Sequence, residues 1–246
     1  YPHIQPDHTI SEIKPLNDGI KLAIISKHSD TSKQALVVWD LLTNSQVFTI
    51  EDPPYFLQWL YFPPDNQELW VFCMDSFEQY NLQSGLLERT INFYSTDKVG
   101  VSPDGRYLIR GIFQSVPNTS IVRFFNSKSD EPFYTEEIDY MITSFRYSPD
   151  SKMVAGSSGL FGTNIIKIWD TETGALIIDF NDYDCGPIFS SDSSMAVFGQ
   201  GNQFSIFSTD SWTLNNSFQN ENPDSMNKPE FFLAGDQILA IQETAR

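Results

Sequence analysis

The sequence has few of the residues that most catalytic and metal sites require. It contains three histidines, all within its first 28 residues, and two cysteines, Cys73 and Cys185, which form no CxxC pair. Nucleophilic triads and metal sites draw mainly on such residues, in suitable positions. We therefore expect no catalytic residues, no metal ligands and no cofactor. Two widely separated cysteines are also typical of a reduced, intracellular protein, so we expect a cytoplasmic location.

Basic residues and long apolar runs are scarce as well. The chain has 15 Lys and Arg against 32 Asp and Glu, for a net charge of −17. An acidic surface repels phosphate backbones and anionic lipids, so we expect no direct nucleic-acid binding. No apolar run approaches the roughly 20 residues of a membrane helix, so we expect no membrane insertion. The expected partners are other proteins, including basic peptide segments, within a multi-protein assembly. The alternative is that the acidity only keeps the protein soluble.

Short apolar strands separated by tight turns are what the chain does contain. The clearest unit begins with the turn Ser148-Pro149-Asp150-Ser151 and the strand that follows it. It continues with the strand Ile165–Asp170, which ends in Trp169-Asp170, and a turn closed by Gly174. Proline presets a turn dihedral and an Asp side chain accepts local backbone donors, which favours turns at these positions. The glycine suits a positive φ angle.

Two series of residues show that this unit is repeated along the chain. The turn aspartates recur 39 to 47 residues apart, and the aromatic residues that end each third strand recur 38 to 45 residues apart. The first series is Asp18, Asp65, Asp104, Asp150, Asp192 and Asp236, and the second is Trp39, Tyr80, Phe125, Trp169 and Phe207. A shared four-strand period of this length is typical of β-propeller blades and has no counterpart in a β-sandwich.

On these residues the chain resembles the WD-repeat β-propeller family, over about residues 11–241 and most strongly at 148–174. Two blades keep the Trp-Asp pair, at Trp39-Asp40 and Trp169-Asp170. The Gly-His pair that usually precedes the first strand is missing in every blade, so the family's buried Asp-His-Ser/Thr-Trp network cannot form. The chain therefore resembles a divergent member of the family, or a related propeller of the YVTN-like sort.

The resemblance implies an all-β fold, a β-propeller built of four-stranded antiparallel blades in a single domain over residues 1–246. We expect five complete blades and part of a sixth. The expected blades span about residues 11–52, 53–94, 95–138, 139–182, 183–220 and, in part, 221–246. An open ring would leave unpaired strand edges, so we expect residues outside the given sequence to complete a ring of about seven blades.

For function, the resemblance implies a non-enzymatic scaffold or regulatory module that binds other proteins. In the family, partners often dock on the face lined by two sets of strand connections, which here carry acidic and aromatic residues. The predicted protein-binding residues are Asp52, Phe77, Phe113, Glu136, Glu137, Asp139, Phe161, Asp182 and Asp184. The alternative is that the acids are solvated loop charges and the phenylalanines pack locally.

A second class of function stays open, a YVTN/lactonase-like propeller enzyme with a site in the central channel. It requires polar or metal-binding groups on several innermost strands. Those strands carry mainly Phe, Leu, Ile and Val, with Gln58 and Arg146 as polar exceptions. The scaffold is therefore the favoured interpretation.

Overall fold

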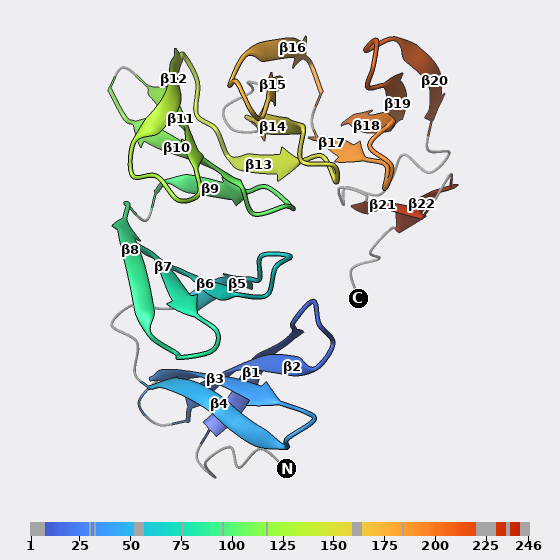
Figure 1. Cartoon of the computed structure of the whole chain (residues 1–246). Coiled ribbons are helices and arrows are strands. Elements are labelled where there is room, and N and C mark those ends of the chain that lie inside the picture. Colours follow the sequence, from blue (N-terminus) through green and yellow to red (C-terminus); the bar gives the residue numbers. More distant parts are fainter. Residues whose placement is uncertain are drawn as a thin grey trace. The chain divides into compact units, whose positions relative to one another are not determined.

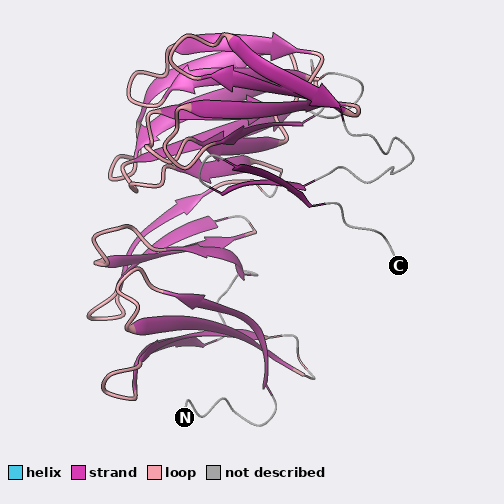
Figure 2. Ribbon diagram, turned by 90° about the vertical axis from the view of Figure 1, so that its right-hand side faces the viewer, coloured by secondary structure: helices cyan, strands magenta, loops and turns pink. Residues whose placement is uncertain are grey.

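The structure is a computed structural model that describes residues 8–29, 31, 33–51, 57–74, 76–94, 96–116, 118–158, 164–183, 185–219, 230–234 and 237–241. Within these ranges every regular element is a strand (Figure 2). No helix within these ranges is long and apolar enough to cross a membrane. The chain divides into two compact units, Tyr1–Ser95 and Thr96–Arg246, and each is described by itself.

The first unit contains two four-stranded sheets, each an antiparallel meander in chain order (Figure 1). The strands of the first sheet are β1 (His8–Pro15), β2 (Lys21–His28), β3 (Gln34–Asp40) and β4 (Ser45–Glu51). The strands of the second sheet are β5 (Leu57–Tyr61), β6 (Glu68–Cys73), β7 (Ser76–Asn81) and β8 (Leu87–Asn92).

The second unit contains three more four-stranded meanders and one two-stranded sheet. The first meander is β9 (Lys98–Val101), β10 (Tyr107–Gln114), β11 (Thr119–Asn126) and β12 (Pro132–Ile138). The second is β13 (Ser144–Tyr147), β14 (Met153–Ser157), β15 (Ile165–Asp170) and β16 (Leu176–Asn181). The third is β17 (Cys185–Phe189), β18 (Met195–Gln200), β19 (Gln203–Ser208) and β20 (Leu214–Gln219), and the pair is β21 (Glu230–Ala234) and β22 (Gln237–Ile241).

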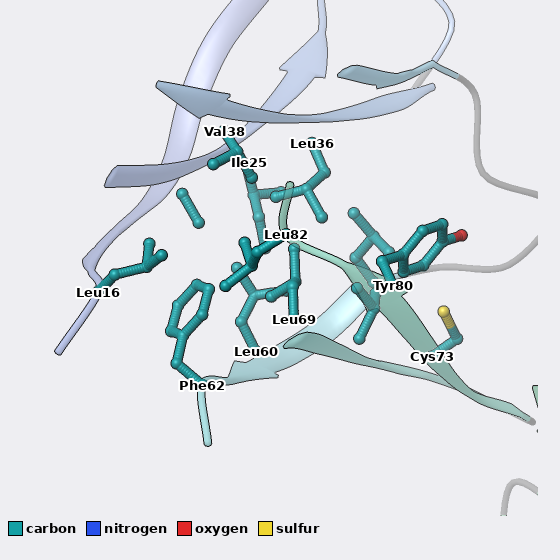
Figure 3. Close-up of a cluster of buried hydrophobic side chains, with 13 residues drawn as sticks. Leu16, Ile25, Leu36, Val38, Leu60, Phe62, Leu69, Cys73, Tyr80 and Leu82 are labelled. Carbon is teal, nitrogen blue, oxygen red and sulfur yellow. The ribbon is translucent and has the colours of Figure 1, made fainter. Parts of the chain in front are cut away.

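These sheets confirm the predicted fold class, with five four-stranded antiparallel sheets and two strands of a sixth. In the first unit, alternate residues of β3 and β6 bury Leu36, Val38, Leu69 and Val71 in one apolar core (Figure 3). The alternate residues Trp70 and Phe72 are buried too, so β6 is covered on both of its faces.

Packing between neighbouring sheets of the second unit depends on aromatic residues. The Trp169 indole has no exposed surface and meets the Phe124 ring of the preceding sheet edge-on, with centroids 5.9 Å apart. The third-strand tryptophan therefore packs between neighbouring blades. Gly174 has φ +74°, as predicted, and a Cβ atom there would lie 2.5 Å from the Tyr134 ring. Both the dihedral angle and the close approach require glycine.

The turns between the first and second strands share one hydrogen-bond pattern in the second unit. In each, a serine hydroxyl donates to the carboxylate two residues later, with distances of 2.6–2.7 Å. The same hydroxyl oxygen accepts the backbone N–H five residues later. The three pairs are Ser102 with Asp104, Ser148 with Asp150, and Ser190 with Asp192. Each aspartate also accepts the backbone N–H two residues later, which confirms the predicted turn chemistry at these three positions.

The same turns bond to one another across neighbouring sheets. The Asp104 N–H donates to Ser151 Oγ, and the Asp150 N–H donates to Ser193 Oγ, each at 3.0 Å. We call these two bonds the turn relay. Ser151 and Ser193 have φ angles of +65° and +62°, where glycine is the usual residue. The hydroxyl offsets this backbone cost by joining each sheet to the preceding one.

Candidate functional site

Six of the nine predicted protein-binding residues belong to the described part of the chain. Asp52, Phe161 and Asp184 lie outside the described residues. The others are Phe77, Phe113, Glu136, Glu137, Asp139 and Asp182.

The two phenylalanines are not presented by loops. Phe77 lies in β7 and is only 2% exposed, with its ring stacked on Phe72 at a centroid distance of 4.7 Å. Phe113 lies in β10, where it is partly buried opposite Ser120 of β11. The expectation of an exposed aromatic is therefore wrong at Phe77, which packs within its sheet as the alternative interpretation held. Phe113 keeps partial exposure on β10, so its part in binding stays a prediction.

Glu136 is placed differently from the expectation too. It lies within β12, and its two carboxylate oxygens accept hydrogen bonds from Lys167 Nζ and Trp169 Nε1 of β15, both at 2.7 Å. We call these contacts the Glu136 clamp. The Glu136 and Lys167 side chains are 19% and 16% exposed. Glu136 therefore holds two sheets together instead of extending from a connection, because its carboxylate satisfies the buried indole N–H.

The remaining three acids are exposed at the surface. Glu137 points to the face of β12 opposite Glu136, because successive strand residues alternate. Asp139 follows β12, and Asp182 follows β16 with a φ angle of +73° and its N–H donating to the Asn164 carbonyl. Since both meanders run in chain order, the ends of β12 and β16 lie at the same end of their sheets. The two connections thus present carboxylates at one end of the second unit.

The buried Tyr140 lies close enough to three carboxylates for their negative charges to act on its phenol. Burial, and then the negative charges of Glu136, Asp139 and Asp179, raise the pKa of the Tyr140 phenol. Asp179 is an exposed residue of β16 opposite Lys167. The Tyr140 hydroxyl is buried and has no hydrogen-bond partner among the described residues. We call Glu136, Asp139 and Asp179 the acidic cluster.

The acidic cluster carries more negative than positive charge. Lys167 neutralises Glu136 at 2.7 Å, which leaves Asp139 and Asp179 to act on an external cation. No group of three or more His, Cys, Asp or Glu side chains with metal-binding geometry occurs among the residues whose positions are described. The run at residues 136–139 was predicted from the sequence as part of the site, but Asp179 was not. Asp179 lies opposite Lys167, the partner of Glu136, because β15 pairs with β16.

Other perturbed carboxylates belong to turns. Hydrogen bonds from Ser190 Oγ and then from the N–H and Oγ of Ser194 lower the pKa of Asp192 to about 2. Burial raises the pKa of Asp150, but hydrogen bonds from Ser148 and Lys152 outweigh this effect and leave the pKa lowered. These aspartates remain ionised as turn acceptors, which is a structural role.

Taken together, the five meanders and the packing within each unit define an all-β protein with a WD40-type β-propeller fold. Kluyveromyces lactis Hsv2 has a similar structure, with a TM-score of 0.65 and 14% identity over 96% of this chain and 78% of that chain. A chain in a crystal structure of the mitotic checkpoint complex is also similar, with a TM-score of 0.60 and 17% identity over 87% of this chain and 68% of that chain. No family model matches the sequence, and neither does any curated protein. At these identities the likeness shows the fold alone.

Proposed function

We propose that this protein is a divergent WD-repeat propeller that acts as a non-enzymatic scaffold for other proteins in the cytoplasm. A propeller provides a rigid framework whose connections carry the binding residues. The mitotic checkpoint complex among the similar structures is a multi-protein assembly, which is in keeping with such a use of the fold.

One observation supports the proposal above the others, namely the uncompensated acids at one end of the second unit. Glu137, Asp139 and Asp182 are exposed at the ends of β12 and β16, and Asp179 lies beside them on β16. Exposed carboxylates contribute little to the stability of a fold, but they accelerate and orient the docking of a cationic partner. The expected partner presents a basic segment to these connections.

The framework beneath these acids is tied together at both ends. The Glu136 clamp joins β12 to β15, and the turn relay joins the opposite ends of the same two sheets. A binding surface on such a framework loses little conformational freedom when a partner docks. This preorganisation supports a docking role for the connections.

The test is co-purification and cross-linking with the full chain in the cells that naturally contain it, at low and then high salt. The proposal predicts a stoichiometric partner that cross-links near residues 136–139 and is released by salt. The variant Glu137→Gln/Asp139→Asn/Asp182→Asn should lose it. The matched control Asp130→Asn/Glu131→Gln/Glu172→Gln removes as much charge from exposed turns at the opposite end of the sheets, and it should keep the partner. Equal capture by both variants would contradict the proposed docking surface.

A further inference from the structure

The outer strand of the fifth sheet, β20, differs from the other outer strands. An outer strand carries one row of unpaired backbone groups, and proteins usually protect it with charge, proline or burial. The other four contain such residues: β4 ends in Glu51, β8 has Glu88 and Arg89, β12 has Pro132 with two glutamates, and β16 has Asp179. β20 reads Leu-Asn-Asn-Ser-Phe-Gln, has no charged residue and no proline, and is exposed along its whole length.

The edge of β20 holds a backbone donor in a replaceable bond. The Ser217 N–H donates at 2.9 Å to Oδ1 of the adjacent Asn216 side chain. A backbone donor bonded to its own neighbour's side chain points away from the β19 ladder, toward the unpaired edge. An incoming carbonyl group can take the place of Asn216 Oδ1 with no loss of hydrogen bonds inside the sheet.

Side chains around this edge are suited to an extended ligand. The exposed Phe218 ring lies 5.1 Å from Phe204 of β19, so an apolar stripe runs outward to the edge. Leu214, near the start of the strand, is 56% exposed. An added strand would place every second side chain beside Phe218 on the same face of the sheet.

Charge decides the kind of occupant. From residue 168 to residue 227 the sequence has no Lys, Arg or His, and it has nine Asp and Glu. Two of these acids, Asp192 and Asp210, lie in turns of the fifth sheet, and Asp210 precedes β20. Hydrogen bonds from Ser208 and then Ser211 lower the pKa of Asp210, so it is ionised at neutral pH. A second copy of the chain would bring like charges together, whereas a cationic segment is attracted.

We infer that β20 is a strand-addition site for an extended partner segment in which apolar residues alternate with Lys or Arg. The inference rests on the proposed function in that the partner is a protein, but it concerns another surface than the acidic connections. The added strand bonds to the outer edge of β20, covers Phe218 with its apolar residues, and directs its basic residues toward the acidic turns of the fifth sheet.

The probe for the test is a seven-residue peptide of alternating lysine and valine, capped at both ends and labelled with a fluorophore. We expect binding by fluorescence anisotropy that weakens with salt. A peptide with glutamate in place of lysine should fail to bind, and so should one whose alternate amides are N-methylated. If the N-methylated peptide binds as well as the parent, the attraction is charge alone and the inference is wrong.

Variants of the full chain complete the test. Ser217→Pro removes only the edge-facing N–H. An edge strand tolerates proline at such a position. The variant should weaken peptide binding roughly tenfold or more. Ser217→Ala keeps the N–H and is the matched control, with binding unchanged. Asn216→Ala removes the internal competitor and should strengthen binding. Unchanged binding in Ser217→Pro, or sedimentation showing a dimer that Ser217→Pro disrupts, would overturn the inference. If Ser217→Pro folds poorly, the binding of the N-methylated peptide and the peptide affinity of Asn216→Ala still test the inference.

The two proposals can fail independently. The variant Glu137→Gln/Asp139→Asn should bind the lysine–valine peptide as the unmodified chain does, because its substitutions lie at the end of β12, in another sheet. If that variant loses the native partner but still binds the peptide, the acidic connections and the β20 edge are separate sites. Loss of peptide binding in the same variant would count against β20 as the site.

Discussion

The Glu136 clamp allows a sharp test of the structure, because one carboxylate serves two donors from the next sheet. Glu136→Ala removes the acceptor for Trp169 Nε1 and the counter-charge of Lys167. The indole of Trp169 is fully buried, so its N–H cannot turn to water. Hydrogen bonds to charged groups contribute about 1.5–3 kcal/mol each. Lys167 is partly exposed and lies opposite Asp179, which reduces the loss on that side.

We therefore expect Glu136→Ala to lower the free energy of unfolding by about 3 kcal/mol, with most of the loss on the indole side. For a domain of this size that corresponds to a fall in Tm of about 6–12 °C. Urea and thermal unfolding of the full chain, followed by far-UV circular dichroism, measure the change. Hydrogen exchange at residues 165–170 shows whether the loss is local to β15.

Two further variants separate the causes of this loss. Glu136→Gln keeps an oxygen acceptor for the indole and loses only the charge, so we expect about half of the effect. Glu137→Ala, the exposed neighbour on the other face of β12, is the matched control, with a change within about 0.5 kcal/mol. If Glu136→Ala is no less stable than Glu137→Ala, the clamp contributes nothing and our reasoning about β12 is wrong.

Two other predictions concern the turns. Ser193→Ala leaves the Asp150 N–H without its acceptor and keeps a strained φ angle, so it should lower the free energy of unfolding by about 1–2 kcal/mol. Ser193→Gly should be less harmful, because glycine tolerates that angle. Urea unfolding in which Ser193→Ala is as stable as the unmodified chain would contradict the turn relay. Asp192 has a folded-state pKa of about 2, below its usual 3.8, so its stabilisation is present above about pH 4 and is lost as the pH falls toward 2. Asp192→Asn should be less stable than the unmodified chain at pH 7 and approach it in Tm near pH 2, and a constant difference across this range would refute the assignment.

Much of the fold could be predicted from the sequence because the repeat signals are local. The Pro, Asp and Gly residues of a turn act through dihedral angles and hydrogen bonds within a few residues. Asp40 and Asp170 illustrate this, since each accepts the N–H of a residue two or three positions later, as predicted. The strands between such turns then follow from apolar alternation.

The candidate site was predictable only in part, because exposure is not a local property. Phe77 and Glu136 are residue types that are common in docking surfaces. The extent of the strands and the pairing between sheets decided where these two side chains lie. Phe77 became a packing residue against Phe72, and Glu136 became the acceptor for a buried indole in the next sheet.

The sequence by itself determined the blade period, the turns and the acidic charge of this protein. Only the tertiary structure decided which carboxylates remain free. Glu136 and Glu137 are adjacent in the chain, yet the alternation of β12 sends one to Lys167 and Trp169 and the other to solvent. Likewise, the sequence shows that β20 has no charge, but only the sheet order shows that no strand of the described residues pairs with its outer edge. The physical reason is that pairing and burial join residues far apart in sequence, whereas turns and periodicity act between neighbours.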